Sequence, residues 1–372
     1  MGAAALVLAA LAAGWAVIAA AGESTSDSAG WAAERERLLA RVERCLGERD
    51  PACLLRQAKA AALWVEDRQA IEWLSSLRAD IHAGLGHLDL ARETAWSIED
   101  GDLRVETLAT IAGQAAAYGD RQGAADLLSE AEAELRDGAQ DFGRIDARAS
   151  IGWAHAKLGD MKRAEARWRE AEDLWNELGA PPEQARALYA LAWCKINAGA
   201  VADARPAIEW LDQQVAWSWP ESEGPPYRFS MSITFDSEGR SHAIQLPIGE
   251  PIARAFAAVL FAQAGMTDEA MEAVKSIEEL AAYWDELGSD DDFPIEVVRA
   301  QAALRRFVDA SNTARAIYTG YGRALAFCVI AHEQGLLAEE NTASLQQSLE
   351  YLRELGPSET ARIAICMAGA IQ

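Results

Sequence analysis

Two pairs of residues in this sequence have the type and spacing for specific chemistry. Cys45 and Cys53 stand on either side of an expected tight helix–helix turn. In an oxidising compartment they would form a disulfide that stabilises the fold by about 2–3 kcal/mol, and otherwise they are two unpaired thiols. Trp153 and Trp193 lie 40 residues apart on two expected helices. Tryptophan is a frequent anchor in protein interfaces, but it also packs between helices.

The sequence offers few other residues for catalysis or metal binding. The sequence has no Gly-rich phosphate loop, no His-Glu-x-x-His motif and no nucleophile elbow. Its five histidines are scattered, and none stands at a ligand or triad spacing from a Cys, Asp or Glu. The acidic run at 290–292 lacks the spaced ligands of a calcium loop. We expect Cys194, Cys328 and Cys366 to be small buried hydrophobic residues. The sequence therefore predicts no catalytic residue, no metal and no cofactor.

The charge of the chain restricts its partners. Its 372 residues include 58 acidic and 34 basic side chains, a formal net charge of -24. Such a surface repels phosphate backbones, which excludes nucleic acid as a partner. Binding to anionic membrane surfaces is disfavoured for the same reason.

The N-terminal segment suggests export. Residues Ala3 to Ala21 carry no charge, and Ala19-Ala20-Ala21-Gly22 has the small residues of a signal-peptidase site. The run is also long enough to span a bilayer as a membrane anchor. We expect residues 1–22 to be a signal peptide or an anchor, and the mature protein to be periplasmic, secreted or membrane-anchored. A mis-assigned start would instead make the protein cytoplasmic.

The middle of the chain repeats itself every 40 residues. Ile111, Ile151 and Leu191 are equivalent, and so are Gly119, Gly159 and Gly199. The step from Gly to an Ala five residues later recurs at Gly86 and Gly265. Apolar residues at three- and four-residue spacing before each glycine predict a helix that the glycine ends. Asp120 and Asp160 would cap the helix that follows. Each unit is thus a helical hairpin that must stack on its neighbours.

These units resemble the tetratricopeptide repeat family. Gly152, Gly159, Ala164, Trp168 and Ala171 match the family's order and spacing of small and large residues. The 40-residue period exceeds the 34 residues of the family, and the family's terminal proline is absent. The resemblance implies an all-α fold, an α-solenoid of stacked hairpins.

The resemblance also implies a binding surface. In that family, the position of Trp153 and Trp193 faces the concave groove. The partner-binding residues expected there are Trp153, Lys157, Arg186, Tyr189, Trp193 and Asn197. Packing between the first helices of successive hairpins is the alternative role for the two tryptophans.

The flanking segments complete the expected organisation. Alternating apolar residues from Tyr227 to Phe235, a turn, and a return strand to Leu246 predict an inserted β-hairpin. The expected parts are a leader over 1–22, a spacer and N-terminal capping hairpin over 23–65, repeats over 66–218, the inserted hairpin over 219–248, and C-terminal helical repeats over 249–372.

These patterns favour one function over two others. We expect a non-catalytic interaction scaffold or adaptor of the cell envelope that binds a protein or peptide through the concave face. One alternative is an accessory subunit of an envelope assembly that docks through the inserted hairpin. The other is an enzyme on a solenoid scaffold.

Overall fold

The protein is a succession of helical hairpins. The computed structural model describes residues 28–135, 142–177, 181–213, 229–235, 241–247, 250–281, 292–336 and 340–372. The first helices of the hairpins are α4 (Arg68–Gly84), α6 (Gly101–Ala117), α8 (Phe142–Lys157), α10 (Pro181–Asn197), α12 (Glu250–Gln263), α14 (Asp292–Ala303), α16 (Gly320–Leu336) and α18 (Pro357–Ala370). The second helices are α5 (Leu88–Trp96), α7 (Arg121–Glu134), α9 (Met161–Glu177), α11 (Val201–Gln213), α13 (Thr267–Ala281), α15 (Phe307–Ala316) and α17 (Thr342–Tyr351), which ends in the 3-10 helix η3 (Leu352–Glu354). Before them stand α2 (Ser28–Gly47) and α3 (Pro51–Ala62). The fold class is all-α.

The repeated glycines end the first helices as the sequence predicts. Gly119 has a φ of 93°, and positive φ recurs at the other four glycines of the series. The amide of Gly119 donates to Ala116 O and that of Asp120 to Ala115 O, which is the Schellman pattern. The Asp120 side chain then accepts from Gly123 N at 2.9 Å and caps α7. The turn chemistry of the repeat is therefore confirmed.

The small residues of the repeat allow close packing within a hairpin. A Cβ atom at Gly152 would lie 2.4 Å from the Trp168 indole nitrogen, so only glycine fits there. Trp168 packs over this glycine and donates to Ala149 O at 3.2 Å. Ala164 and Ala171 are fully buried beside it. The positions that resemble the tetratricopeptide repeat thus form the contact between α8 and α9.

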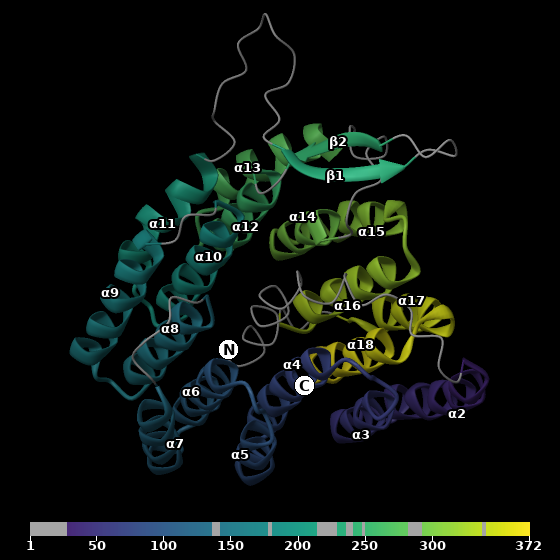
Figure 1. Cartoon of the computed structure of the whole chain (residues 1–372), viewed down its shortest axis with the longest axis horizontal. Helices are drawn as coiled ribbons and strands as arrows, with labels where there is room; N and C mark the ends of the chain where they lie inside the picture. Colours follow the sequence, from purple (N-terminus) through teal and green to yellow (C-terminus); the bar gives the residue numbers. More distant parts are fainter. Residues whose placement is uncertain are drawn as a thin grey trace, which may run out of the picture.

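The array of hairpins closes on itself. The last helix, α18, packs against α3 and α4 as well as α16, and one core cluster joins α2, α3 and α4 to α14 through α18. Trp31 on α2 donates its indole N–H to Leu355 O at 3.3 Å. Figure 1 shows the first helices around the inside of the resulting ring and the second helices outside. The expectation of an array with an open concave face is therefore corrected, because α3 of the N-terminal hairpin packs against α18, the first helix of the final unit.

Two strands interrupt the helices between α11 and α12. β1 (Phe229–Phe235) pairs antiparallel with β2 (Ser241–Pro247), with Phe229 opposite Pro247 and Phe235 opposite Ser241. The expected leader, the turn between the strands and most of the acidic run at 290–292 lie outside the described residues. Among the helices that are described, none is both long and apolar enough to cross a membrane.

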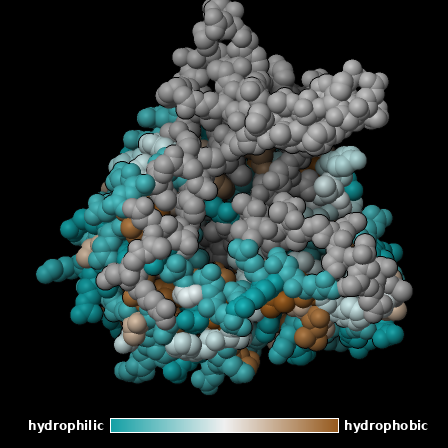
Figure 2. Space-filling view, viewed as in Figure 1, coloured by the Kyte–Doolittle hydropathy of each residue, from teal (hydrophilic) through white to brown (hydrophobic). Residues whose placement is uncertain are grey.

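In the view of Figure 2 the described residues are mostly hydrophilic, with separate hydrophobic spots among them. The apolar side chains are instead collected in three core clusters, which follow the ring from one hairpin to the next. Buried polar side chains lie on the first helices as well.

Candidate functional site

The inner face of the ring is built from equivalent positions of the first helices. Glu106 on α6, Asp146 on α8 and Arg186 on α10 are 40 residues apart in sequence. α6 packs against α8, and α8 packs against α10. Equivalent positions on stacked helices of this kind lie about 10 Å apart. Three charged, half-buried side chains therefore form a row across three neighbouring helices.

Trp153 and Trp193 lie two helical turns further along the same inner stripe. Their exposed fractions are 1% and 2%, and their ring centroids are 6.2 Å apart. The Trp153 ring covers Gly113 of α6, where an added Cβ would come within 1.9 Å of the ring. The expectation that both rings are exposed in a groove is therefore wrong. They pack from one first helix to the next, because glycine leaves room for the indole.

Tyr189 is also buried rather than exposed. It is 1% exposed, and its ring stacks on Phe256 of α12 at a centroid distance of 4.5 Å. The charge of Arg299 on α14 acts on its hydroxyl. Burial raises the pKa of this phenol, so it stays protonated. Tyr189 thus joins side chains from helices that are not adjacent in the array.

The remaining three predicted residues stay half-buried on the inner stripe. The Lys157 ammonium donates to Asn197 O at 2.5 Å and lies 5.8 Å from the Trp153 ring centroid. Burial lowers the pKa of Lys157. Asn197 donates to Trp193 O at 2.9 Å. The structure therefore brings together Lys157, Asn197 and the two tryptophans, and it places Arg186 in the charged row.

The acidic part of this row was missed by sequence reasoning. Burial raises the pKa of Glu106, and the carboxylates of Asp146 and Asp80 raise it further, while Arg186 partly opposes them. Asp80, on α4, is 2% exposed, and burial raises its pKa well above the ordinary value. Its Oδ1 atom has no hydrogen-bond partner in the described structure. The 40-residue alignment contained the signal, since it places Glu106 and Asp146 at equivalent positions of two first helices.

A second polar group lies further round the ring. Arg299 donates to Glu296 at 2.9 Å, and both side chains are at most 2% exposed. Burial, opposed by Arg299, raises the pKa of Glu333 on α16 to about 7. The charge of Arg299 acts on both Tyr189 and Glu333, so side chains from α10, α14 and α16 lie near one another here. In this group Arg299 and Glu296 form an ion pair within α14.

The cysteines are paired at the closure of the ring. Cys45 and Cys53 form a disulfide with Cα atoms 5.5 Å apart, on either side of the turn from α2 to α3. Cys328 on α16 and Cys366 on α18 form a second one, with Cα atoms 6.2 Å apart. The expectation that these two are unpaired is wrong, because the stacking of consecutive hairpins places Cys328 on α16 and Cys366 on α18 side by side. Cys194 is free and buried as expected, and burial raises the pKa of its thiol.

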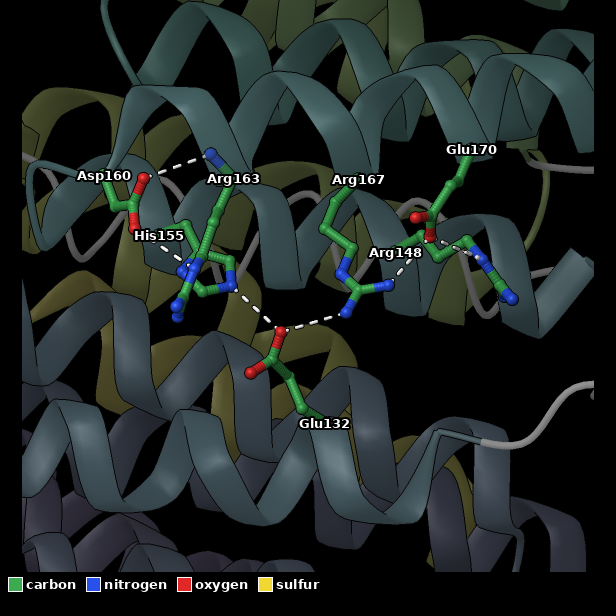
Figure 3. A network of polar contacts seen from close by, with 7 residues as sticks. All are labelled: Glu132, Arg148, His155, Asp160, Arg163, Arg167 and Glu170. Atoms are coloured by element: carbon green, nitrogen blue, oxygen red, sulfur yellow. Dashed lines mark hydrogen bonds and ion pairs between the residues drawn. The ribbon is translucent and has the colours of Figure 1, made fainter.

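Charged residues between the hairpins form a separate network. Figure 3 shows Glu132 of α7 accepting from His155 of α8 at 3.1 Å and from Arg167 of α9 at 3.0 Å. Burial raises the pKa of Glu132, but these two hydrogen bonds outweigh it and the net shift is downward. Arg167 also pairs with Glu170 at 2.9 Å. This network joins neighbouring hairpins, and its charges are matched.

The described residues contain no group of three His, Cys, Asp or Glu side chains that could hold a metal ion.

Comparisons with known proteins add little to this geometry. No protein-family model and no curated protein matches the chain. The crystal structure of Ton1535 from Thermococcus onnurineus NA1 is 14% identical, with a TM-score of 0.38, over 77% of this chain and 98% of that one. Likeness at this level supports no argument about the site.

Proposed function

We propose that this protein is a non-catalytic binding protein of the cell envelope that holds a protein or peptide partner against the inner face of its ring. The proposal keeps the α-solenoid character of the stacked repeats but moves the binding surface from an open groove to the interior of the closed array. The inner stripe of α6, α8 and α10 is the part of the molecule that would make the contact.

One observation carries the proposal. The indole N–H groups of Trp153 and Trp193 and the Oδ1 atom of Asp80 are buried on or beside this stripe without a hydrogen-bond partner in the described structure. An unmatched buried polar group costs about 1–3 kcal/mol, and native proteins rarely leave one without a reason. A partner that supplies the missing donors and acceptors would remove that cost.

The titratable groups of the interior favour binding over catalysis. Burial raises the pKa of the Cys194 thiol and of the Tyr189 phenol, so both remain protonated and are weak nucleophiles. The buried guanidinium of Arg299 is paired with Glu296. These groups have the character of a rigid, specific core.

Two disulfides support the export part of the proposal. Structural disulfides persist in oxidising compartments and are rare in reducing ones. Both disulfides lie in the core cluster that closes the ring. An exported protein would therefore keep the closed ring that the proposed binding surface requires.

Photo-crosslinking tests the inner-face proposal. A benzophenone amino acid placed at Asn197, which is half-buried on the inner stripe, is compared with the same residue at Glu209, which is exposed on the outer helix α11. Irradiation in the native envelope fraction should give a defined adduct from position 197 and none from position 209. An adduct from position 209 alone, or none from either, would contradict the proposal.

A further inference from the structure

One rim of the ring carries large apolar side chains that are exposed. This rim is formed by the turns that lead into the first helices, and it includes the start of α2 and the end of α3. Leu63 and Trp64 lie in the turn before α4, Trp96 ends α5, and Tyr318 lies in the turn before α16. Leu63 is 80% exposed and Tyr318 is 91% exposed. We call these four residues, together with Trp31 at the start of α2, the aromatic rim.

Contacts across the closure of the ring bring two parts of the aromatic rim together. The rings of Trp31 and Trp64 have centroids 6.1 Å apart. Trp31 donates to Leu355 O, and an added Cβ at Gly320 would lie 3.9 Å from Cδ2 of Leu355. Tyr318 stands two residues before Gly320. The exposed residues before α4 and before α16 therefore belong to one stretch of surface, although they are far apart in the sequence.

The aromatic rim continues in the other direction to Trp96. The backbone N–H of Asp100 donates to Glu72 at 3.0 Å, and Glu99 forms an ion pair with Arg68. The turn that follows Trp96 therefore touches the start of α4. Single apolar side chains are common on protein surfaces, but a run of neighbouring ones marks a surface that meets another apolar phase.

The sequence before α2 indicates what this phase is. The uncharged run Ala3–Ala21 is long enough to cross a bilayer, and only six residues separate it from Ser28, the first residue of α2. Seven extended residue steps cover at most about 25 Å. Trp31 follows Ser28 within one helical turn. A bilayer that contains this run therefore lies within reach of the aromatic rim.

The residue types and the nearby charges suit an uncharged lipid surface. Tryptophan and tyrosine are enriched where membrane proteins cross the water–lipid interface. Glu34, one turn after Trp31, is paired with Arg41 at 2.6 Å, and Arg68 is paired with Glu72 at 3.0 Å. These charges are matched within the protein. The net charge of -24 opposes an anionic bilayer, so a zwitterionic one is favoured.

We propose that the aromatic rim rests in the interfacial layer of a zwitterionic bilayer, the one that residues 3–21 enter. The ring then lies with this rim against the membrane, and the opposite rim, where the glycine turns end the first helices, faces water. The inference rests on the export part of the proposed function. It uses none of the residues of the inner stripe, so the inner-face binding and the membrane contact can fail separately.

Fluorescence quenching in vesicles tests the inference with the full chain. A nitrobenzoxadiazole label is attached to Leu63→Cys, to Tyr318→Cys or, as a control, to Leu90→Cys; Leu90 is 49% exposed near the start of α5, on the opposite rim. Cys194 is buried and does not compete for the label. The vesicles are phosphatidylcholine with or without doxyl-labelled phosphatidylcholine. We expect the quencher to remove about half of the emission at positions 63 and 318 and less than about a tenth at position 90.

A charge placed on the aromatic rim should weaken the contact. In chains labelled at position 318, Leu63→Asp should reduce the quenching by about half, whereas Leu90→Asp should leave it unchanged. Both leucines are exposed, so thermal unfolding should be the same in the two variants. Addition of phosphatidylglycerol to the vesicles should lower the quenching at position 63. An increase would show attraction through basic groups and would contradict the proposal.

The remaining outcomes also decide the matter. Equal quenching at positions 63 and 90, or no quenching at positions 63 and 318, overturns the proposal. No quenching together with blue-shifted emission from position 63 in lipid-free solution assigns the rim to residues 3–21 of the same chain instead. If Leu63→Cys does not fold, the comparison of positions 318 and 90 decides. The adduct expected at position 197 depends on none of these results, so it tests the inner-face proposal independently.

Discussion

The charges between the hairpins and the charges inside the ring follow opposite patterns. In the network of Figure 3, Glu132 is bonded by both His155 and Arg167, and its pKa is lowered. On the inner stripe, Asp80 and Glu106 lie near each other, and their pKa values are raised. The same residue types thus form hydrogen-bonded ion pairs in one region and are only partly compensated in the other.

The difference follows from what each region has to do. The network of Figure 3 holds α7, α8 and α9 in register, and a matched ion pair serves that purpose without any ligand. A buried carboxylate without a matching cation lowers the free energy of unfolding. Binding of a cation to the folded state would raise that free energy again. A region whose charges are unmatched is therefore a better place to look for binding than one whose charges are matched.

Removal of an inner tryptophan should have the largest effect on stability. Trp193→Ala deletes a ring that is 2% exposed and packs on Trp153. Cavities of this size cost about 3–5 kcal/mol. Chemical denaturation of the variant measures the change, and a loss under about 1 kcal/mol would mean that the ring does not pack in the core. Trp96→Ala, at a 43% exposed position on α5, is the control.

Glu333, in the polar group around Arg299, and Glu132, in the network of Figure 3, should respond to pH in opposite directions. The pKa of Glu333 is raised to about 7 in the folded protein, so its contribution is fully present below its unfolded pKa and is lost as pH rises through about 7. That contribution amounts to about 2 kcal/mol between pH 5 and pH 8. The lowered pKa of Glu132 instead gives a contribution that is lost in acid, as pH falls through its folded pKa.

Urea denaturation between pH 5 and pH 8 measures this dependence. In Glu333→Gln the fall in unfolding free energy towards pH 8 should be smaller than in the unchanged protein. Glu132→Gln should leave the dependence in this range as it is. If the two variants have the same pH profile, the contrast between the regions is not electrostatic.

Loss of the matched charge should destabilise the protein moderately. Glu132→Gln removes an acceptor that bonds both His155 and Arg167, but the side chain is 28% exposed and solvent compensates in part. We expect a loss of about 1 kcal/mol from bonds of this kind. Arg169→Gln, which affects an exposed pair with Glu165 on the same helix α9, is the control and should change stability by less than about 0.5 kcal/mol.

Loss of the unmatched charge should have the smallest effect and the opposite sign. Asp80→Asn keeps the size of the side chain and removes a buried carboxyl group whose ionisation is disfavoured by burial and whose Oδ1 atom has no partner in the described structure. We expect the variant to gain about 0.5–1 kcal/mol near pH 7. The melting temperature measures the gain. A large destabilisation would show that the Asp80 carboxylate is already compensated.

Local features of the fold could be predicted from the sequence. Three features define the hairpin: the glycine at the end of each first helix, the Asp120 cap and the alanines where the two helices touch. Each acts over a few residues, so their spacing in the sequence is sufficient to predict it. The closure could not be predicted in this way. It depends on contacts such as Trp31 with Leu355, which lie 324 residues apart and follow no repeat.

The site was predicted only in part for a related reason. Periodicity indicated which residues share the inner stripe, and Arg186, Lys157 and Asn197 stay half-buried there. Periodicity could not indicate whether the side chains of that stripe are exposed or buried, because a tryptophan recurs at the same spacing whether it lines a groove or packs in a core. Cys328 and Cys366 stand on consecutive first helices, which the repeat already makes neighbours, but periodicity alone could not indicate that their sulfur atoms come within bonding distance.

The closure also sets the order in which the chain can become stable. Helices α2 and α3 share their core with α18, so their apolar faces stay uncovered until the last helix has been made and has left the site of synthesis. Hairpins in the middle of the chain need only their nearest neighbours. We therefore expect the N-terminal hairpin to be the last to acquire native contacts although it is synthesised first, and to depend on chaperones for longer than the rest of the chain.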